Sequence, residues 1–255
     1  MNFLKNIFHK KQIFPAADLS ILKVDVHSHL IPGIDDGAKT MKDSLNLIRA
    51  FKEFGYKKLI TTPHIMADQY RNTPEIISGG LEKVRMELKN QNLEMELDAA
   101  AEYYIDHEFL KLIEEKKLLS FGDIQSRQAG KYVLVEISFF SEPPMLKEAL
   151  FNLQIAGYKP VLAHAERYGF WHNSYEKFED MKARGALLQL NIGSLPGYYS
   201  PETKKIAERL IDDGMYDLIG SDCHHLGHIE LMKTCQTEEY LHKILSSGKL
   251  LNSTL

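Results

Sequence analysis

The chain has 255 residues, of which 44% are hydrophobic and 26% are charged, a composition ordinary for a globular protein that buries one large core. Its formal net charge of -4 argues against broad nucleic-acid binding, which usually needs a basic face. No apolar run approaches the roughly 18 residues of a membrane span, and the two cysteines, Cys223 and Cys235, form no C-x-x-C motif, as expected for reduced thiols in a cytoplasmic protein.

Residues 1–20 are predicted to be a leader that precedes one domain over residues 21–255. The leader is too interrupted for a signal peptide, and no small-residue cleavage site follows it. Its apolar residues fall at helical spacing among lysines: Phe3, Leu4, Ile7 and Phe8. One interpretation is a short helix that lies on a membrane surface or docks on a partner. The interpretation we favour is a frayed leader that packs loosely on the domain.

Four helices are predicted from caps and apolar periodicity. Thr40, Thr73 and Ser200 are predicted N-caps, since apolar residues recur at helical spacing after each of them. The residue after Thr73 and the residue after Ser200 are prolines, which suit a first helical position. A fourth apolar stripe begins at Leu146. Glycines stand where predicted helices would stop: Gly55, Gly157, Gly185 and Gly214.

Short apolar runs between these helices are predicted to be strands. Several are apolar without alternation, as are strands that are buried on both faces in a parallel sheet. The predicted strands lie near residues 22–27, 58–63, 95–101, 132–138, 160–164, 187–192 and 217–221. Such a succession of strand–helix units favours a closed or nearly closed β/α barrel, with a doubly wound open sheet as the competing architecture.

Histidines gather at the ends of these predicted strands. In β/α barrels the loops that follow the strands carry the active site, so this placement indicates a site. The histidines at or just beyond strand ends are His27, His29, His64, His164, His224, His225 and His228.

The first two strand ends supply four candidate ligands. Residues two apart on a strand share a face, so His27 and His29 can bind one ion, although His-x-His also occurs in strands that bind no metal. Asp36 in the next loop can ligate an ion, or can belong to a turn before the helix cap. His64 ends the second strand, either as a ligand or as a polar loop residue.

Two glutamates lie in apolar surroundings at the next strand ends. Glu102 follows three alanines, and Glu136 lies between Val135 and Ile137. Burying a carboxylate is costly without a cation or hydrogen-bond donors to offset it. Each glutamate is therefore either an ion-paired acid of the core or a ligand of a shared metal, and the shared metal is the sharper hypothesis.

The fifth strand ends in His164-Ala165-Glu166-Arg167-Tyr168. His164 can ligate a metal. Arg167 offers a planar fork of donors that suits a phosphate, or it forms a salt bridge with Glu166 or another acid.

The seventh strand ends in Ser221-Asp222-Cys223-His224-His225. Asp222 and His224 share a face, while Cys223 points away as a small core residue. The candidates together are too many for one tetrahedral zinc and suit two or three ions bridged by carboxylates, with Mn, Fe or Zn favoured over Ca or Mg. The candidate ligands are His27, His29, Asp36, His64, Glu102, Glu136, His164, Asp222 and His224.

The order of these motifs resembles the PHP (polymerase and histidinol phosphatase) superfamily. The order is Asp-x-His-x-His, Pro-His, Glu, Glu, His-x-Glu-Arg-Tyr and Ser-Asp-x-His. The loop from His27 to Gly37 (His-Ser-His-Leu-Ile-Pro-Gly-Ile-Asp-Asp-Gly) and the segment from His164 to Tyr168 are similar to the bacterial PHP-type protein-tyrosine phosphatases of capsule and exopolysaccharide operons. The resemblance runs from about residue 24 to about residue 245.

The resemblance implies a distorted (β/α)7 barrel of the TIM-like PHP fold with a trinuclear metal site, often active with Mn. It implies that the nine candidate ligands bind this cluster, that Arg167 holds the substrate phosphate, and that Arg167, Asp222 and His224 are catalytic. The implied substrate is the tyrosine-rich tail of a tyrosine autokinase that controls polysaccharide export. In one departure from the family, the loop after the last motif carries His225 and His228 where relatives have an arginine, and either histidine could replace it.

A metal-dependent mechanism follows from this ligand set. Metals depress the pKa of bound water, so a hydroxide that bridges two ions is a nucleophile for in-line attack on phosphorus. Arg167 would stabilise charge on the phosphoryl oxygens. A phosphocysteine route is disfavoured because no Cys-x5-Arg loop is present. Tyr198 and Tyr199 either stack on a phosphotyrosine ring or pack within their loop, and we favour the loop packing.

Three other functions stay open at this stage. A PHP phosphatase of a small molecule such as histidinol phosphate would use the same metals, and a metal-binding scaffold would use them without turnover. An amidohydrolase would usually need a bridging lysine on the fourth strand, where this chain has Glu136. The sequence leaves a homo-oligomer open.

Overall fold

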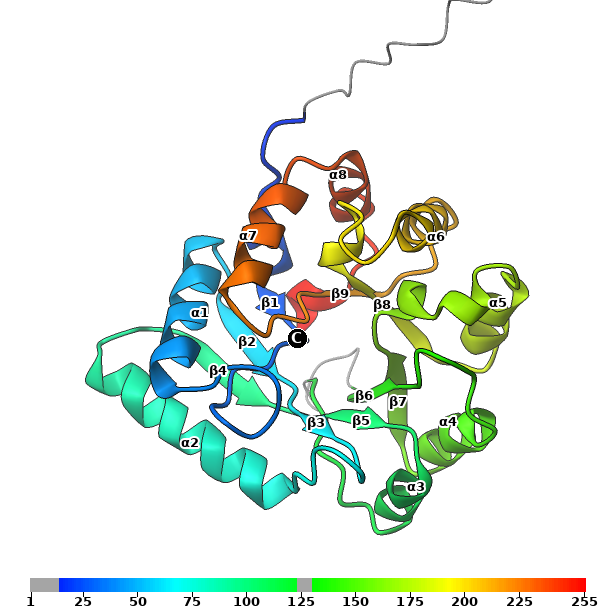
Figure 1. Cartoon of the computed structure of the whole chain (residues 1–255), viewed down its shortest axis with the longest axis horizontal. Coiled ribbons are helices and arrows are strands. Elements are labelled where there is room, and N and C mark those ends of the chain that lie inside the picture. Colours follow the sequence, from blue (N-terminus) through cyan, green and yellow to red (C-terminus); the bar gives the residue numbers. More distant parts are fainter. Residues whose placement is uncertain (1–13, 123–129) are drawn as a thin grey trace, which may run out of the picture.

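The computed structural model describes residues 14–122 and 130–255, and the predicted helical residues Phe3 to Phe8 of the leader lie outside them. Helices surround a ring of parallel strands (Figure 1). The strands are β1 (Val24–Asp25), β2 (Lys58–Thr61), β3 (His64–Ile65), β4 (Glu96–Ala99), β5 (Glu102–Tyr104), β6 (Lys131–Glu136), β7 (Tyr158–Leu162), β8 (Leu187–Asn191) and β9 (Leu218–Gly220). The helices are α1 (Met41–Glu53), α2 (Pro74–Asn90), α3 (His107–Glu114), α4 (Leu146–Ile155), α5 (Glu176–Ala183), α6 (Pro201–Asp212), α7 (Leu226–Cys235) and α8 (Glu239–Leu245).

Two of the predicted strands are each broken into two short pieces. Only Thr62 and Pro63 separate β2 from β3, and only Ala100 and Ala101 separate β4 from β5. Hydrogen bonds continue across the break, because the amide of Ala100 donates to the Thr61 carbonyl at 2.9 Å. The pieces β1-β2-β4 and β3-β5-β6-β7-β8-β9 therefore follow one ring of strands. β3 and β5 lie just after the predicted ranges 58–63 and 95–101, and the other strands overlap their predicted ranges.

The ring closes between its first and last strands. Ser28 and Cys223 form a parallel bridge, and the amide of Asp222 donates to the His27 carbonyl at 2.8 Å. At the opposite end the side-chain amide of Asn252 fills the gap between β1 and β9. This closure confirms the predicted distorted β/α barrel and excludes the doubly wound sheet.

The predicted helix starts are confirmed. Thr40 accepts a hydrogen bond from the Asp43 amide at 3.2 Å, and the Asp43 carboxylate accepts one from the Thr40 amide at 3.0 Å, which completes the capping box. Thr73 and Ser200 cap α2 and α6, and Pro74 and Pro201 begin them. The four glycines at the predicted stops all have positive φ.

Apolar residues form two clusters on either side of the strands. The larger lies between the strands and the helices and contains Trp171, Phe51 and Phe109. The smaller lies inside the barrel and includes Val26, Ile60, Leu134, Val161 and Leu218. Cys223 and Cys235 are free and buried, as predicted for Cys223. Within the described part of the chain, no helix has the length and apolar character needed to cross a bilayer.

Replacing Asn252 by alanine is expected to lower the free energy of unfolding by about 3 kcal/mol. The Asn252 side chain donates to the carbonyls of Val24 and Ile219 and accepts from the Ile219 amide, at 3.0, 2.7 and 3.0 Å. The substitution leaves these three backbone groups of the interior without their partner. Urea unfolding would measure the loss, and the exposed Asn90→Ala variant is the matched control, expected to change stability by less than about 0.5 kcal/mol.

Candidate metal centre

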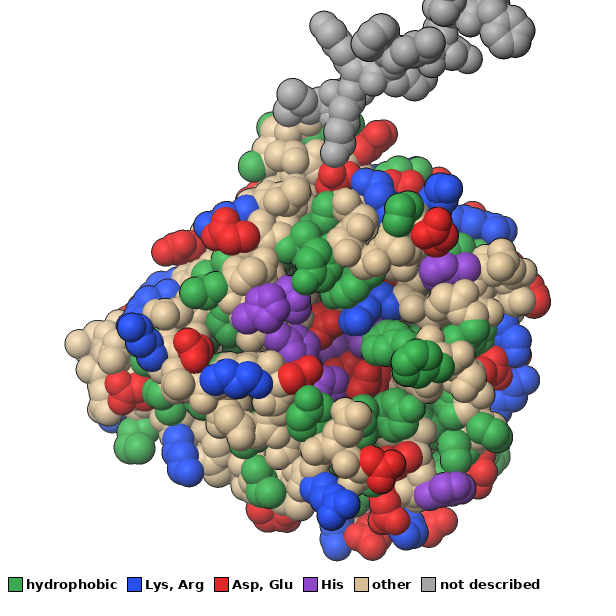
Figure 2. All heavy atoms as spheres, viewed as in Figure 1, with side chains coloured by type: hydrophobic (Ala, Val, Ile, Leu, Met, Phe, Trp, Pro, Cys, Tyr) green, Lys and Arg blue, Asp and Glu red, His purple; other side chains and the backbone are tan. Residues whose placement is uncertain are grey.

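The predicted ligands meet in one cavity at the carboxyl ends of the strands. Figure 2 shows acidic and histidine side chains gathered in a hollow, with hydrophobic side chains beside it. The cavity has a volume of about 340 Å³. It is lined by Asp36, His64, Glu102, Glu136, Phe139, His164, Arg167, Tyr198, Tyr199, Asp222, His224, His225 and His228. His27 and His29 are fully buried and contact Glu102, so the structure brings together all nine side chains that the sequence singled out.

Three overlapping groups of these side chains could each hold an ion. Within each group the possible ligand atoms all lie within 4.8 Å of one another. The groups are His29–Asp36–His64–His224, His27–His29–Glu102–Asp222 and His64–Glu102–Glu136. Glu102 belongs to two of them and also contacts His164, the one predicted ligand outside the groups, at 3.0 Å from Oε1 to Nε2.

A hydrogen bond at Nδ1 orients the ring of each of three histidines. Nδ1 of His27 lies 2.9 Å from Gln189 Oε1, Nδ1 of His29 lies 2.8 Å from Asp35 Oδ2, and Nδ1 of His224 lies 2.9 Å from the Asp222 carbonyl. Each of these oxygens can only accept, so each Nδ1 carries the proton and donates. Nε2 is therefore the nitrogen of each ring that can give up its proton to bind a metal ion, as in metal sites whose histidines are held by carboxylate or carbonyl groups.

Buried charges of opposite sign balance each other in this centre. Burial lowers the pKa of His27, but Glu102 and Asp222 outweigh it and raise this pKa to about 9. Burial raises the pKa of Glu102, but His27 and His64 outweigh it and hold this pKa well below the usual range. A carboxylate that stays ionised at full burial needs cations around it, and divalent ions can take the place of the histidine protons.

The residues present fit a cluster of divalent ions. Nδ1 of His64 and Oε1 of Glu136 are buried and lie 3.0 Å apart, yet they are not aligned for a hydrogen bond. Nδ1 of His164 is also buried without a hydrogen-bond partner among the described residues. Buried polar atoms of this kind usually have a partner, and an ion can supply it. Imidazole and carboxylate donors suit Mn, Fe or Zn.

Two of the predicted ligands hold a backbone conformation that few residues other than glycine adopt. His164 has φ of 34° and Asp222 has φ of 50°, and each lies two residues beyond the end of a strand. Residues in this region cost of order 1–3 kcal/mol and cluster at functional sites. The turn aims both side chains into the cavity rather than along the barrel wall.

Gly37 allows the loop that carries Asp35 and Asp36 to lie against His29. A Cβ at this position would stand 2.3 Å from the His29 carbonyl oxygen and 2.4 Å from the His29 Cβ. We therefore expect Gly37→Ala to push this loop away and to reduce both metal content and activity by tenfold or more. The matched control is Gly79→Ala, whose Cβ would meet no atom within 4 Å, and unchanged metal content in both variants would contradict the expectation.

Arg167 lies at the edge of the cavity between two aromatic rings. Its Nη1 donates to Asp222 Oδ2 at 2.8 Å, so it forms a salt bridge with an acid other than Glu166. Its guanidinium carbon lies 4.5 Å from the Phe139 ring centroid and 4.0 Å from the Tyr199 ring centroid. Stacking between two rings restricts the guanidinium to one plane while its remaining donors line the cavity.

Tyr199 packs against Arg167 and Asn191, which lie outside its loop. Its hydroxyl accepts a hydrogen bond from Asn191 Nδ2 at 2.7 Å, and its ring covers Arg167. Tyr198 is 55% exposed at the cavity mouth. His225 and His228 line the cavity, with ring centroids 4.1 Å apart.

Gln189 and Phe139 are site residues that the sequence analysis missed. Gln189 lies between Leu188 and Leu190, a signal of the same kind that identified Glu136. Phe139 follows the end of β6 in Ser138-Phe139-Phe140-Ser141, where two adjacent aromatics in a loop at the active end could have marked it.

We expect Gln189→Leu to weaken metal binding by 10–100-fold. The His27 Nδ1 loses its acceptor, so the ring is no longer fixed with Nε2 toward Glu102. Competition with a chelating dye would measure the affinity. Gln154→Leu is the matched control, because the Gln154 amide donates to the carbonyls of Leu150 and Arg184, remote from the centre.

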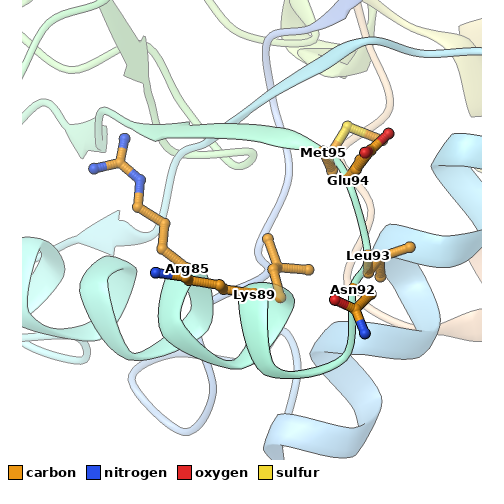
Figure 3. A pocket seen from close by; sticks show the side chains of 7 residues that line it. Arg85, Lys89, Asn92, Leu93, Glu94 and Met95 are labelled. Atoms are coloured by element: carbon orange, nitrogen blue, oxygen red, sulfur yellow. The ribbon is translucent and has the colours of Figure 1, made fainter.

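Another cavity, of about 350 Å³, lies where α2 leads into β4, at the opposite end of the barrel (Figure 3). It is lined by Arg85, Leu88, Lys89, Asn92, Leu93, Glu94 and Met95. Arg85 is held there by the Leu97 carbonyl at 2.8 Å and by Asp98 at 2.7 Å. With no histidine among these lining residues, this cavity does not share the chemistry of the candidate metal centre.

Known proteins are similar to this chain over the whole length of the barrel. A family model described as "Capsular polysaccharide synthesis, CpsB/CapC" matches residues 23–247. The tyrosine-protein phosphatase YwqE of Bacillus subtilis is 28% identical over 80% of this chain and 78% of its own length. The tyrosine-protein phosphatase CpsB of Streptococcus pneumoniae is 25% identical over 80% of this chain and 83% of its own.

Solved structures show the same fold. One solved structure comes from a study of YwqE from Bacillus subtilis and CpsB from Streptococcus pneumoniae, which that study describes as metal-dependent tyrosine phosphatases. It has a TM-score of 0.77 at 25% identity, and the match covers 90% of this chain and 89% of that chain. A phosphotriesterase homology protein from Escherichia coli, with phosphate in its active site, has a TM-score of 0.53 at 15% identity and covers 88% of this chain and 91% of its own.

Proposed function

Because the chain belongs to the CpsB/CapC family of capsular polysaccharide synthesis proteins, we propose that it is a metal-dependent protein-tyrosine phosphatase. One observation carries the proposal: nine imidazole and carboxylate side chains and one arginine meet at the carboxyl end of a barrel, around a single cavity. The names of the similar proteins from Bacillus subtilis and Streptococcus pneumoniae support the same activity.

In this proposal the nine side chains hold two or three divalent ions, with Mn preferred and Fe or Zn as alternatives. Bound there, the ions would lower the pKa of water and polarise the phosphoryl group, so that hydroxide is available for attack near neutral pH. The ligands would be His27, His29, Asp36, His64, Glu102, Glu136, His164, Asp222 and His224.

Arg167 would bind the phosphate of the substrate. Its stacked guanidinium presents donors to the cavity, where they can pair with two phosphoryl oxygens and stabilise the charge that grows on them. Asp222 orients Arg167 through their 2.8 Å hydrogen bond, and His224 lies beside it in the same cavity. His225 and His228 line the same cavity and can donate to the phosphate in place of a second arginine.

The physiological substrate in this proposal is the tyrosine-rich tail of a tyrosine autokinase that regulates capsule or exopolysaccharide synthesis. We place the reaction in the cytoplasm, in keeping with the free thiols of Cys223 and Cys235. Residues 21–255 form the phosphatase domain in this scheme, with residues 1–20 as its leader. Part of that leader is anchored, since the Ala17 amide donates to the Gln236 carbonyl at 2.8 Å.

The test is phosphate release from a tyrosine-phosphorylated peptide, with Mn added and again after chelation, and with histidinol phosphate alongside. We expect release from the peptide that requires the metal and that exceeds release from histidinol phosphate. Release from histidinol phosphate alone would support the metal-dependent chemistry but contradict the proposed phosphotyrosyl protein substrate. If the metal-loaded protein releases phosphate from neither compound, the proposed enzymatic activity is contradicted and a metal-binding scaffold is favoured.

A further inference from the structure

A second cavity opens beside the metal centre, at the same end of the barrel. It has a volume of about 380 Å³ and is formed by β3, β5, α3 and the loop after β3. His64 lines the metal centre, and the next residue, Ile65, lines this second cavity. Tyr70 forms the partition, since it lines the second cavity while its ring stacks on His64 with centroids 5.3 Å apart. We call this second cavity the side pocket.

The side pocket has an apolar floor and apolar walls. Tyr103 and Phe109 are buried, their ring centroids lie 5.2 Å apart, and the Tyr103 hydroxyl already accepts a hydrogen bond from the Leu119 amide at 2.7 Å. Ile65, Met66 and Leu112 add further apolar surface to the lining. The surface available to a ligand is therefore mostly hydrocarbon and aromatic carbon.

The polar residues of the side pocket are largely committed to the fold. Asp106 caps α3 by accepting from the amide of Phe109 at 2.8 Å, and it also accepts from the amide of Ala67 at 3.3 Å. Asn72 donates to the carbonyls of Ile34 and His64, at 2.9 and 2.8 Å. A ligand would gain most of its affinity here from burial of apolar surface rather than from new hydrogen bonds.

The wall of the side pocket is a closed turn. The amide of Met66 donates to the Tyr70 carbonyl at 2.9 Å, and the amide of Tyr70 donates back to the Met66 carbonyl at 3.0 Å. Arg71 strengthens the turn by donating from Nε to the Ala67 carbonyl at 2.9 Å. The pocket is thus present before a ligand binds, and filling it costs little ordering of the loop.

We propose that the side pocket receives an apolar side chain of the polypeptide that carries the phosphotyrosine, an inference that rests on the proposed function. Alternate side chains of an extended peptide lie about 7 Å apart on one face. When the phosphotyrosine enters the metal centre, a neighbouring side chain can therefore reach a cavity that begins one residue further along β3. A small phosphomonoester has no group to fill it, so the side pocket selects for protein substrates with an apolar residue near the phosphotyrosine.

The experiment uses the metal-loaded full chain and a set of phosphotyrosyl peptides of glycine and serine. Each peptide carries one leucine, placed at a position from three residues before to three residues after the phosphotyrosine, and p-nitrophenyl phosphate is the internal standard. We expect leucine at one or two positions to raise kcat/KM about tenfold over the peptide without leucine, the gain from burying one such side chain.

Variants of the side pocket connect this gain to the structure. Leu112→Glu places a charge in the pocket and Ala67→Leu narrows it, and each is expected to abolish the leucine gain, whereas the conservative Leu112→Met keeps it. All rates are expressed relative to p-nitrophenyl phosphate, so a general loss of folding or metal cancels. A wild-type rate that is independent of leucine position, or a gain that survives both disruptive variants, would contradict the proposed role of the side pocket. Neither result would contradict the proposed phosphatase function. Failure of the wild type to hydrolyse any phosphotyrosyl peptide, with p-nitrophenyl phosphate still cleaved, would instead overturn the proposed function and the inference with it.

Discussion

Glu102→Gln is expected to lose metal ions from the centre and to lower phosphatase activity at least a hundredfold. The carboxylate contacts His27 at 3.1 Å, His64 at 3.2 Å and His164 at 3.0 Å, and it belongs to two of the three groups that could hold an ion. Glutamine has the same shape but no charge. At an effective dielectric constant near 20, removing a unit charge about 4 Å from a cation costs on the order of 4 kcal/mol, roughly a thousandfold in affinity.

Metal analysis of the purified protein, together with phosphate release from a tyrosine-phosphorylated peptide, would measure this effect. The matched control is Glu142→Gln, at a half-buried glutamate that accepts hydrogen bonds from Trp171 at 2.9 Å and Lys177 at 2.8 Å, away from the cavity. The control is expected to keep both its metal and its rate. Full metal content in Glu102→Gln would show that this carboxylate is a core acid paired with histidines, the alternative that the sequence left open.

The sequence predicted the barrel and the nine candidate ligands that the structure brings together largely for one physical reason. Parallel strands are buried on both faces, so a histidine or carboxylate at the end of such a strand stands out against apolar neighbours. Glu102 after three alanines and His64 after Thr61-Thr62-Pro63 are cases of this contrast. Because the carboxyl ends of all strands meet at one end of a barrel, strand position alone was enough to assemble the site.

Features that depend on contacts across the barrel could not be predicted in this way. The left-handed backbone at His164 and Asp222 has only a weak signal in residue type, since His and Asp adopt it more often than other non-glycine residues but are extended or helical at most positions. The placement of Gly37 against His29 joins a loop to a strand, and nothing local distinguishes it from an ordinary turn glycine. A salt bridge of Arg167 with Glu166 or another acid was one of the two alternatives, but nothing local indicates the actual partner, Asp222, which lies 55 residues away along the chain.

Glu166 shows why the local pairing fails. Its Oε1 accepts from the Asn191 amide at 2.9 Å and from the Ser194 hydroxyl at 2.6 Å, and its Oε2 accepts from the Tyr216 hydroxyl at 2.9 Å. These bonds join the segment after β7 to β8 and the loops beyond it. With its carboxylate occupied in the interior, Glu166 leaves Arg167 free to turn toward the cavity.

That orientation of Arg167 leads to the expectation that Arg167→Ala lowers kcat/KM for a phosphotyrosyl peptide by about 100–1000-fold, the usual effect of removing one strong donor to a developing negative charge. Metal content should stay, because Arg167 belongs to none of the groups that could hold an ion, and Asp222 keeps the hydrogen bond from Asn191 Nδ2 at 2.9 Å. Inhibition by inorganic phosphate should weaken in parallel, since the lost donors bind the phosphoryl oxygens of substrate and product alike.

Arg167→Lys separates the effect of charge from the effect of geometry. Lysine keeps the positive charge but has no planar fork to stack between Phe139 and Tyr199, so it should recover only part of the rate. If Arg167→Ala kept the wild-type rate with a full metal complement, Arg167 would serve only to pair with Asp222, and phosphate binding would have to rest on the metals with His225 and His228.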